Sequence, residues 1–269
     1  MPATINYANR FQAEEEVSSY EQEEYRAGSY SSCIWEMQRP VVEKIITDFK
    51  KGRPGPVRLL DFACGTGRVL TVLEPLVTSA WGVDISPHMA VVARTKCPAS
   101  RVCVGDILAQ PDLLAGETFD LISWFRFVLN AEPALRVAIL RRLREALAEP
   151  HGLLLVNVHG NARSLRHPAI AWKRRRQPAA DARRMLNEMT PREMKELLRG
   201  AGFNIVRQMG FGIMPPTIYR TPLRGPAKTV DRLLAGENGW SGRSVDLLFV
   251  CQPEKNCIKG HVQASTAKH

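Results

Sequence analysis

The sequence lacks the features that mark several classes of protein. No apolar run approaches the roughly 18 residues that a membrane-spanning helix requires. Residues 1–17 carry three consecutive glutamates and no apolar block, so we expect neither a membrane span nor a secretory signal. Internal repeats and low-complexity tracts are also missing. With 45% hydrophobic and 24% charged residues, the composition excludes a disordered or collagenous chain and is that of a globular protein.

Cysteine is sparse and scattered. The six cysteines form no Cys-x-x-Cys pair and no cluster with histidine at the spacing of a zinc site. We therefore expect neither a disulfide framework nor a metal, and interpret the cysteines as reduced thiols of a cytoplasmic protein.

The formal net charge of +10 is unevenly distributed along the chain. Residues 1–50 hold nine acidic and five basic side chains, whereas residues 160–184 hold eight basic side chains and one acidic. Such a basic segment is compatible with nucleic acid or an acidic substrate, and also with a solvated helix face. Trp172 is the single aromatic residue in the segment, which favours the solvated face because nucleic-acid sites interleave aromatic side chains.

Short apolar runs alternate with amphipathic stretches over most of the chain. The apolar runs predict strands at 57–62, 79–84, 101–104, 119–125, 152–158, 203–209 and 245–251. Helical spacing predicts helices at 68–77 and 133–148, a helix that starts at Pro87 with Ser86 as its N-cap, and a helix from the capping box Thr190-Pro-Arg-Glu193 to about residue 200.

Apolar strands that alternate with helices are typical of a parallel sheet covered on both faces, with right-handed crossovers. The sequence therefore predicts one α/β domain over residues 51–251. We expect a separate N-terminal segment over residues 1–50, insertions at 160–188 and 211–243, and a loose polar tail over 252–269.

The most informative stretch is a strand that runs into a glycine turn and then a helix, Asp61-Phe-Ala-Cys-Gly-Thr-Gly67. Glycines permit positive φ and let a ligand approach the backbone without a Cβ atom in the way. In open α/β sheets, ligands bind beyond the carboxyl ends of the strands. Asp84 ends the second strand, where its carboxylate can accept hydrogen bonds from both ribose hydroxyls. Asp106 follows the third strand and is placed to reach an adenine amino group.

A dinucleotide site would require a third glycine three positions after the second, where this chain has Leu70. The chain instead resembles the class I S-adenosylmethionine-dependent methyltransferases over roughly residues 30–210. Their acid–x–x–x–Gly–x–Gly motif is matched by Asp61 through Gly67, their ribose acid by Asp84 and their adenine-site acid by Asp106.

The resemblance implies a Rossmann-like fold with S-adenosylmethionine as the cofactor. Its seven-stranded, mostly parallel sheet has the order 3-2-1-4-5-7-6 with an antiparallel last strand and helices on both faces. The N-terminal segment is then a helical lid that contributes Tyr30 and Trp35 to the cofactor site. The other implied contacts are Asp61, Ala63, Cys64, Gly65, Gly67, Asp84, Ile85, Asp106, Ile107, Trp124 and Phe125. For the two isoleucines at the adenine, and for Trp124 and Phe125 at the sulfonium, plain core packing is the alternative.

The end of the fourth strand, Ser123-Trp-Phe-Arg-Phe-Val-Leu-Asn130, bears on the acceptor. It has neither the Asn/Asp-Pro-Pro-Tyr/Phe run of enzymes that methylate exocyclic amines of nucleic acids nor the Pro-Cys of cytosine C5 enzymes. It resembles more closely the small-molecule branch, in which an aromatic–His–x–Leu run is common and Arg126 takes the position of that histidine. Candidate acceptor contacts are Arg126, Asn130, Asn157 and Tyr219.

His159 is the candidate general base, because imidazole titrates near neutral pH; a loop histidine without a catalytic role is the alternative. We predict that the protein transfers a methyl group from S-adenosylmethionine to an O or N atom of a small molecule by in-line displacement. Two alternatives stay open: an RNA methyltransferase that uses the basic segment 160–184, and a cofactor-binding module without catalysis.

Overall fold

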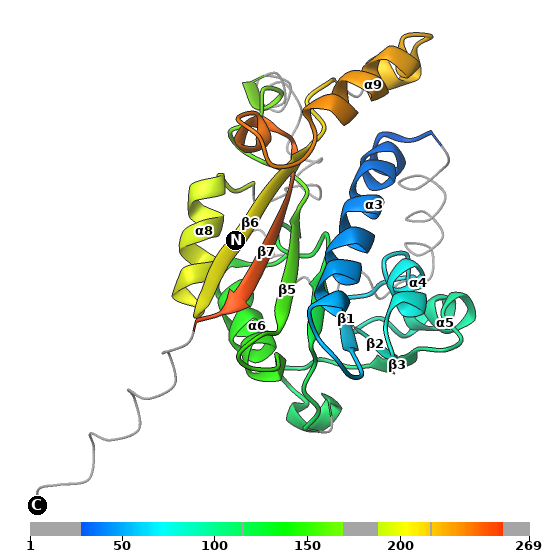
Figure 1. Cartoon of the computed structure of the whole chain (residues 1–269), viewed down its shortest axis with the longest axis vertical. Coiled ribbons are helices and arrows are strands. Elements are labelled where there is room, and N and C mark those ends of the chain that lie inside the picture. Colours follow the sequence, from blue (N-terminus) through cyan, green and yellow to red (C-terminus); the bar gives the residue numbers. More distant parts are fainter. Residues whose placement is uncertain (1–27, 115, 169–187, 216, 255–269) are drawn as a thin grey trace, which may run out of the picture.

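The computed structural model describes residues 28–114, 116–168, 188–215 and 217–254, which form a seven-stranded sheet with the order β3-β2-β1-β4-β5-β7-β6 (Figure 1). β7 is antiparallel to both of its neighbours, and the other neighbouring strands are parallel. The predicted fold and strand order are therefore confirmed. The strands are β1 (Arg58–Phe62), β2 (Ser79–Asp84), β3 (Arg101–Val104), β4 (Leu121–Trp124), β5 (Leu153–Val158), β6 (Phe203–Phe211) and β7 (Asp246–Pro253).

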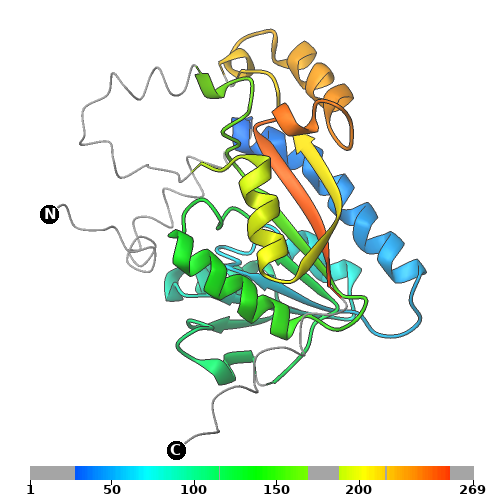
Figure 2. The same ribbon diagram turned by 90° about the vertical axis from the view of Figure 1, so that its left-hand side faces the viewer.

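Helices cover both faces of the sheet (Figure 2). One face packs against α3 (Tyr30–Lys51), α4 (Leu70–Leu73) and α5 (Pro87–Lys96), and the other against α6 (Pro133–Ala146) and α8 (Pro191–Gly200). Short 3-10 helices and α9 (Arg224–Leu234) complete the described elements: η2 (Glu74–Leu76), η3 (Pro111–Leu114), η5 (Ile218–Arg220) and η6 (Ser241–Arg243). No helix among the described residues is both long and apolar enough to cross a membrane.

The two faces bury two separate apolar cores, because side chains of a strand point alternately to opposite sides. On β1, Leu59 packs with the helices α3, α4 and α5, whereas its neighbour Leu60 packs with α6 and α8. Both side chains are fully buried. This double burial explains why the central strands read as continuous apolar runs.

The predicted helix over 68–77 is shorter than expected. The structure has one turn of α-helix, α4, followed by the 3-10 helix η2. Pro75 lies within η2, and proline ends an α-helix because it lacks a backbone N–H and its ring clashes with the preceding turn. The predicted caps are present: Ser86 accepts a hydrogen bond from the amide of Met89, and Thr190 and Glu193 form the reciprocal capping box.

All six parallel strands end at one edge of the sheet, called here the carboxyl edge, and antiparallel β7 begins there. The segments 160–168 and 212–245 both leave the sheet at this edge, so both parts of the predicted insertions that the structure describes lie on the same side as the glycine turn. In Figure 1, α9 projects beyond this edge. Of the predicted N-terminal segment 1–50, the structure describes residues 28–50, and most of these belong to α3. Ile45 and Ile46 of this helix are buried in the core.

Candidate active site

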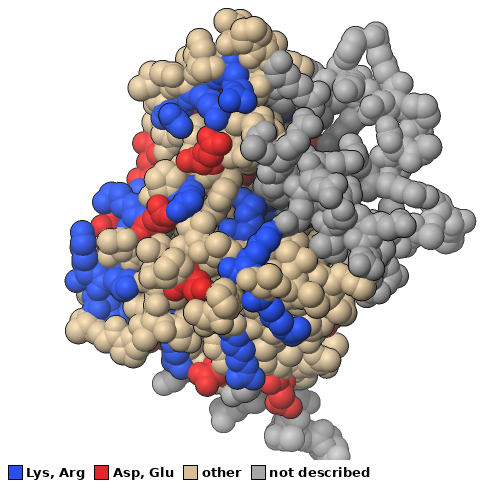
Figure 3. Space-filling model, turned by 90° about the vertical axis from the view of Figure 1, so that its right-hand side faces the viewer, with Lys and Arg blue, Asp and Glu red and all other residues tan. Residues whose placement is uncertain are grey.

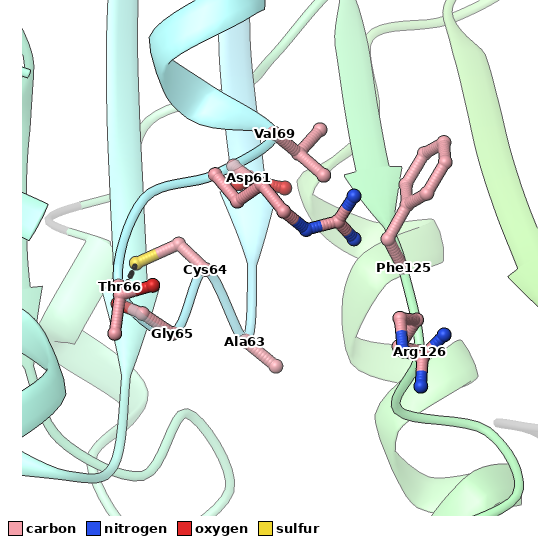
Figure 4. Close-up of a pocket in the computed structure, with 9 residues that line it drawn as sticks. Asp61, Ala63, Cys64, Gly65, Thr66, Val69, Phe125 and Arg126 are labelled. Atoms are coloured by element: carbon pink, nitrogen blue, oxygen red, sulfur yellow. Dashed lines mark hydrogen bonds between the residues drawn. The ribbon is translucent and has the colours of Figure 1, made fainter. Parts of the chain in front are cut away.

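A pocket lies at the carboxyl edge between the turn after β1 and the residues after β4. Figure 4 shows Phe125 and Arg126 on the side opposite Asp61 and Val69. The nine lining residues are Asp61, Ala63, Cys64, Gly65, Thr66, Arg68, Val69, Phe125 and Arg126. Six of them were expected from the sequence; Thr66, Arg68 and Val69 were not, because Thr66 takes an unspecified position of the motif and the other two follow it.

The turn after β1 is built from residues with left-handed backbone conformations. Ala63, Gly65 and Gly67 have φ values of 54°, 54° and 80°. The two glycines serve different purposes. A Cβ atom on Gly65 would meet open space, whereas one on Gly67 would lie 3.0 Å from the Cys97 sulfur and 3.2 Å from the Ala93 backbone. Gly65 thus leaves room at the pocket, and Gly67 lets the turn pack closely on α5.

Asp61 is buried at the end of β1 beside the pocket. Its Oδ1 accepts a hydrogen bond from the Ser123 hydroxyl at 2.6 Å, while its Oδ2 has no hydrogen-bond partner among the described residues. Burial raises the pKa of the Asp61 carboxyl to about 7, and the bond from Ser123 opposes the shift. A buried carboxylate oxygen without a donor is costly, so Asp61 fits a ligand that brings a cationic donor, such as the amino group of S-adenosylmethionine.

Asp84 fastens the glycine turn to the end of β2. Its Oδ2 accepts a hydrogen bond from the Gly65 amide at 2.8 Å, and its Oδ1 accepts one from the Ser86 amide at 2.9 Å. Burial raises the pKa of the Asp84 carboxyl, although these backbone bonds favour its ionised form. Each carboxylate oxygen can accept a second hydrogen bond, so the expected contact with ribose hydroxyls remains compatible with this geometry.

The residues expected at the adenine follow β2 and β3 and do not line the pocket. Ile85 is half-buried, and the Asp106 side chain accepts a hydrogen bond from the Leu108 amide at 2.8 Å. Ile107 is buried in the core on the α6 side, which is the packing role that the sequence left open for it.

Trp124 at the end of β4 and Phe125 directly after it point to opposite faces of the sheet. Trp124 is fully buried and packs against Phe62 and Phe127, with ring centroids 6.2 Å and 5.6 Å apart. Phe125 lines the pocket, and its ring meets the ring of Trp35 from α3 edge-to-face at 5.9 Å. The structure therefore places Phe125 at the pocket, Trp35 against Phe125 outside the lining, and Trp124 in the core.

Arg126 lines the pocket with a positive φ of 56°. Residues other than glycine rarely adopt this conformation, which costs of order 1–3 kcal/mol. It persists only where contacts with the surrounding structure offset that strain. The Asn130 side chain donates a hydrogen bond to the Arg126 carbonyl at 2.7 Å. Asn130 therefore supports the loop that positions Arg126.

A buried carboxylate that the sequence analysis missed joins three elements behind the pocket. Asp246 at the start of β7 accepts hydrogen bonds from Asn157 of β5 and, at 3.0 Å, from Gln38 of α3. Burial raises the pKa of the Asp246 carboxyl, and the positive charge of Arg126 is the largest influence against that shift. The one feature of the sequence that could have indicated this buried carboxylate is the presence of an acidic residue inside the apolar run 245–251.

Tyr30 and Tyr219 lie together away from the pocket lining. Their rings meet edge-to-face at 5.4 Å, and the guanidinium of Arg166 lies 4.6 Å from the Tyr30 ring centroid. The Tyr219 hydroxyl donates a hydrogen bond to the buried Asp231 of α9. These contacts connect α3 to the segment 212–245. His159, the candidate base, is half-buried one residue beyond β5 and does not line the pocket.

No group of three or more histidine, cysteine or acidic side chains in the described part of the chain is placed to hold a metal ion. Five cysteines are free thiols, and Cys257 lies outside the described residues. Burial raises the pKa of the Cys64 thiol at the pocket, which keeps it protonated and a poor nucleophile.

The family model of a methyltransferase domain matches residues 34–208 of the chain. The chain belongs to this family. A Geobacillus sp. (strain WCH70) protein that is named only as a methyltransferase is 35% identical over 112 residues, which are 40% of this chain and 44% of that protein. The chain thus aligns with less than half the length of this relative. A ubiquinone biosynthesis O-methyltransferase from Cereibacter sphaeroides (strain ATCC 17025 / ATH 2.4.3) is 27% identical over 65% of this chain and 73% of its own length.

The fold is also found among solved structures. Magnesium protoporphyrin IX methyltransferase from Synechocystis PCC 6803, solved with bound S-adenosylhomocysteine, aligns with a TM-score of 0.57 and 15% identity over 90% of this chain and 99% of that one. At 15% identity this likeness shows the shared fold. The family assignment is what marks the chain as an S-adenosylmethionine-dependent methyltransferase.

Proposed function

We propose that this enzyme methylates an O or N atom of a small-molecule acceptor. The observation that carries the proposal is the pocket at the carboxyl edge, where the glycine turn, the buried Asp61 and the end of β4 meet. The relative from Cereibacter sphaeroides is an O-methyltransferase of ubiquinone biosynthesis, which supports a small acceptor here.

In this proposal, residues on one side of the pocket bind the cofactor and residues on the other side bind the acceptor. S-adenosylmethionine supplies an electrophilic methyl group when bound, so the protein mainly has to position the acceptor and exclude water. Asp61, Asp84 and the glycine turn hold the cofactor side. Arg126 and the segments 160–168 and 212–245 form the acceptor side, because they leave the sheet at the same edge.

His159 remains the candidate base for an acceptor that is protonated at neutral pH, such as a phenol. It stands one residue beyond β5, at the same edge of the sheet as Arg126. A neutral amine acceptor would not require it.

The alternative of an RNA methyltransferase depends on the basic segment 160–184, most of which lies outside the described residues. On the face in Figure 3, lysine and arginine form separate groups with acidic side chains among them rather than one continuous basic surface. The described part of this face therefore offers no continuous basic surface for a nucleic acid.

A salt titration and a turnover screen together test the proposal. We expect release of S-adenosylhomocysteine with phenol, carboxylate or amine acceptors from a metabolite panel, and no retention on RNA at about 150 mM salt. Binding to RNA that falls steeply with salt, by about 0.7 log units per log unit of salt for each phosphate contacted, would favour the RNA alternative. Cofactor binding without turnover of any acceptor would favour the non-catalytic module.

A further inference from the structure

Arg68 is a pocket residue whose place is fixed by an aromatic partner. It follows the glycine turn directly, and its guanidinium lies 4.7 Å from the ring centroid of Trp35. The Trp35 ring in turn meets the Phe125 ring edge-to-face at 5.9 Å. The guanidinium is thus held between the turn and α3, on the Asp61 side of the pocket, by a cation–π contact.

The pocket has the charges that an α-amino acid requires. An amino acid carries an ammonium and a carboxylate on one carbon, so its site needs an acid and a base close together. Asp61 offers the acid, with one carboxylate oxygen that has no hydrogen-bond donor among the described residues. Arg68 and Arg126 are the two cationic side chains that line the pocket.

The electrostatics distinguish the two arginines. The charge of Arg68 lowers the pKa of Asp61, and Arg68 also acts on Asp246, where Arg126 has the larger effect. Of the two arginines, Arg68 is thus the one whose charge acts on Asp61.

We propose that Arg68 binds the α-carboxylate of the cofactor's methionine end while Asp61 receives its ammonium. The inference rests on the assignment of this pocket to S-adenosylmethionine. Guanidinium binds carboxylate through two parallel hydrogen bonds, and the contact with Trp35 orients the guanidinium before the ligand arrives.

Calorimetric binding of two ligands tests the proposal without turnover. The ligands are S-adenosylhomocysteine and its decarboxylated form, which keeps the amine and the adenosine. Wild-type protein should bind the first at least about 10-fold more tightly, as is typical of a hydrogen bond between charged groups. Arg68→Met should lose this preference: its affinity for S-adenosylhomocysteine falls about 10-fold, while its affinity for the decarboxylated ligand changes less than about 2-fold.

A matched control is present at the other end of the sheet. Arg101 lies over the Trp81 ring at 4.1 Å, so Arg101→Met removes the same kind of stacking contact away from the pocket and should leave both affinities unchanged. Arg68→Lys keeps the charge and should retain part of the preference. Thermal unfolding of each variant shows that it is folded.

Three results would overturn the inference: equal weakening of both ligands in Arg68→Met, a preference that survives in that variant, or a preference that Arg126→Met removes instead. A wild-type protein that binds neither ligand would refute the cofactor assignment itself, and is thereby distinguished from a failure of the Arg68 proposal alone.

Discussion

Cofactor affinity should depend on pH through Asp61. The pKa of this carboxyl is raised from 3.8 to about 7 by burial, so a large fraction is protonated at neutral pH in the free enzyme. A ligand ammonium favours the ionised carboxylate, and its binding must therefore expel a proton below pH 7. Each pH unit below that value weakens binding by up to about 10-fold, and the fall from pH 8 to pH 5.5 amounts to about 30-fold.

Isothermal titration of S-adenosylhomocysteine between pH 5.5 and 8 measures this slope directly. Titrations at pH 6 in buffers with different ionisation enthalpies should show release of close to one proton. Asp61→Asn removes the titrating group, so its affinity should be lower at pH 8 and nearly independent of pH. An equal slope in wild type and in Asp61→Asn, or uptake of a proton, would refute the assignment of Asp61 to the ammonium.

The same shift has a consequence for the stability of the free enzyme. A carboxyl whose pKa is higher in the folded state than in the unfolded chain does not lower the free energy of unfolding below about pH 3.8. The destabilisation grows as the pH rises toward 7, because the unfolded chain ionises first, and it stays constant above 7. Its size at pH 8 is about 4 kcal/mol at most. Asp61→Asn without cofactor should therefore unfold at a higher temperature than wild type at pH 8.

Three further predictions concern the surroundings of the pocket. Asp84→Ala should weaken cofactor binding at least about 10-fold in calorimetry, because it removes the carboxylate that holds the Gly65 amide; unchanged affinity in a folded variant would contradict its role. Gly67→Ala should lower the free energy of unfolding by about 2–3 kcal/mol in a denaturant titration, since its Cβ would press on α5, whereas Gly65→Ala meets open space and should cost less. His159→Ala should reduce the turnover of a phenolic acceptor about 100-fold with no change in cofactor affinity, and undiminished turnover would remove it as the base.

The residues at the carboxyl edge near the glycine turn could be predicted because they follow directly on recognisable strands. Asp61, Asp84 and Asp106 come at or just after the ends of β1, β2 and β3, and parallel strands bring their carboxyl ends to one edge. The apolar runs located those strands from local sequence alone. For this reason the strand positions and most of the pocket lining agree with the expectations, whereas the strand order was expected from the resemblance to class I methyltransferases.

The residues missed by the sequence analysis depend on contacts between distant parts of the chain. Asp246 meets Gln38, 208 residues earlier, and Asn157, 89 residues earlier. No local pattern relates these positions. The prediction that Asn157 contacts the acceptor overlooked this bond, which uses its amide group. Arg68 gives a similar case: it directly follows the glycine motif, but its contact with Trp35 on α3 is between residues that no local pattern relates.

The alternation of side chains along the predicted strand 119–125 would have assigned Trp124 and Phe125 to opposite faces of the sheet. Consecutive residues of a strand face opposite sides, so both side chains could not reach one pocket. The apolar nature of both neighbours hid this difference, because each face of the sheet is covered by helices and either residue can be buried.

The proposed function assigns cofactor binding and acceptor choice to different parts of the carboxyl edge. The cofactor side lies on the turn after β1, whose backbone is fixed by Asp84 and by packing on α5. The segment 212–245 contacts α3 through the Tyr30–Tyr219 ring pair, and the Tyr219–Asp231 hydrogen bond ties that segment together internally; neither contact involves a residue of the glycine turn. Since these two sets of contacts share no side chain, substitutions in the segment 212–245 should leave the glycine turn undisturbed. We therefore expect acceptor specificity to be encoded in that segment rather than in α3, whose Trp35 contacts Arg68 at the pocket.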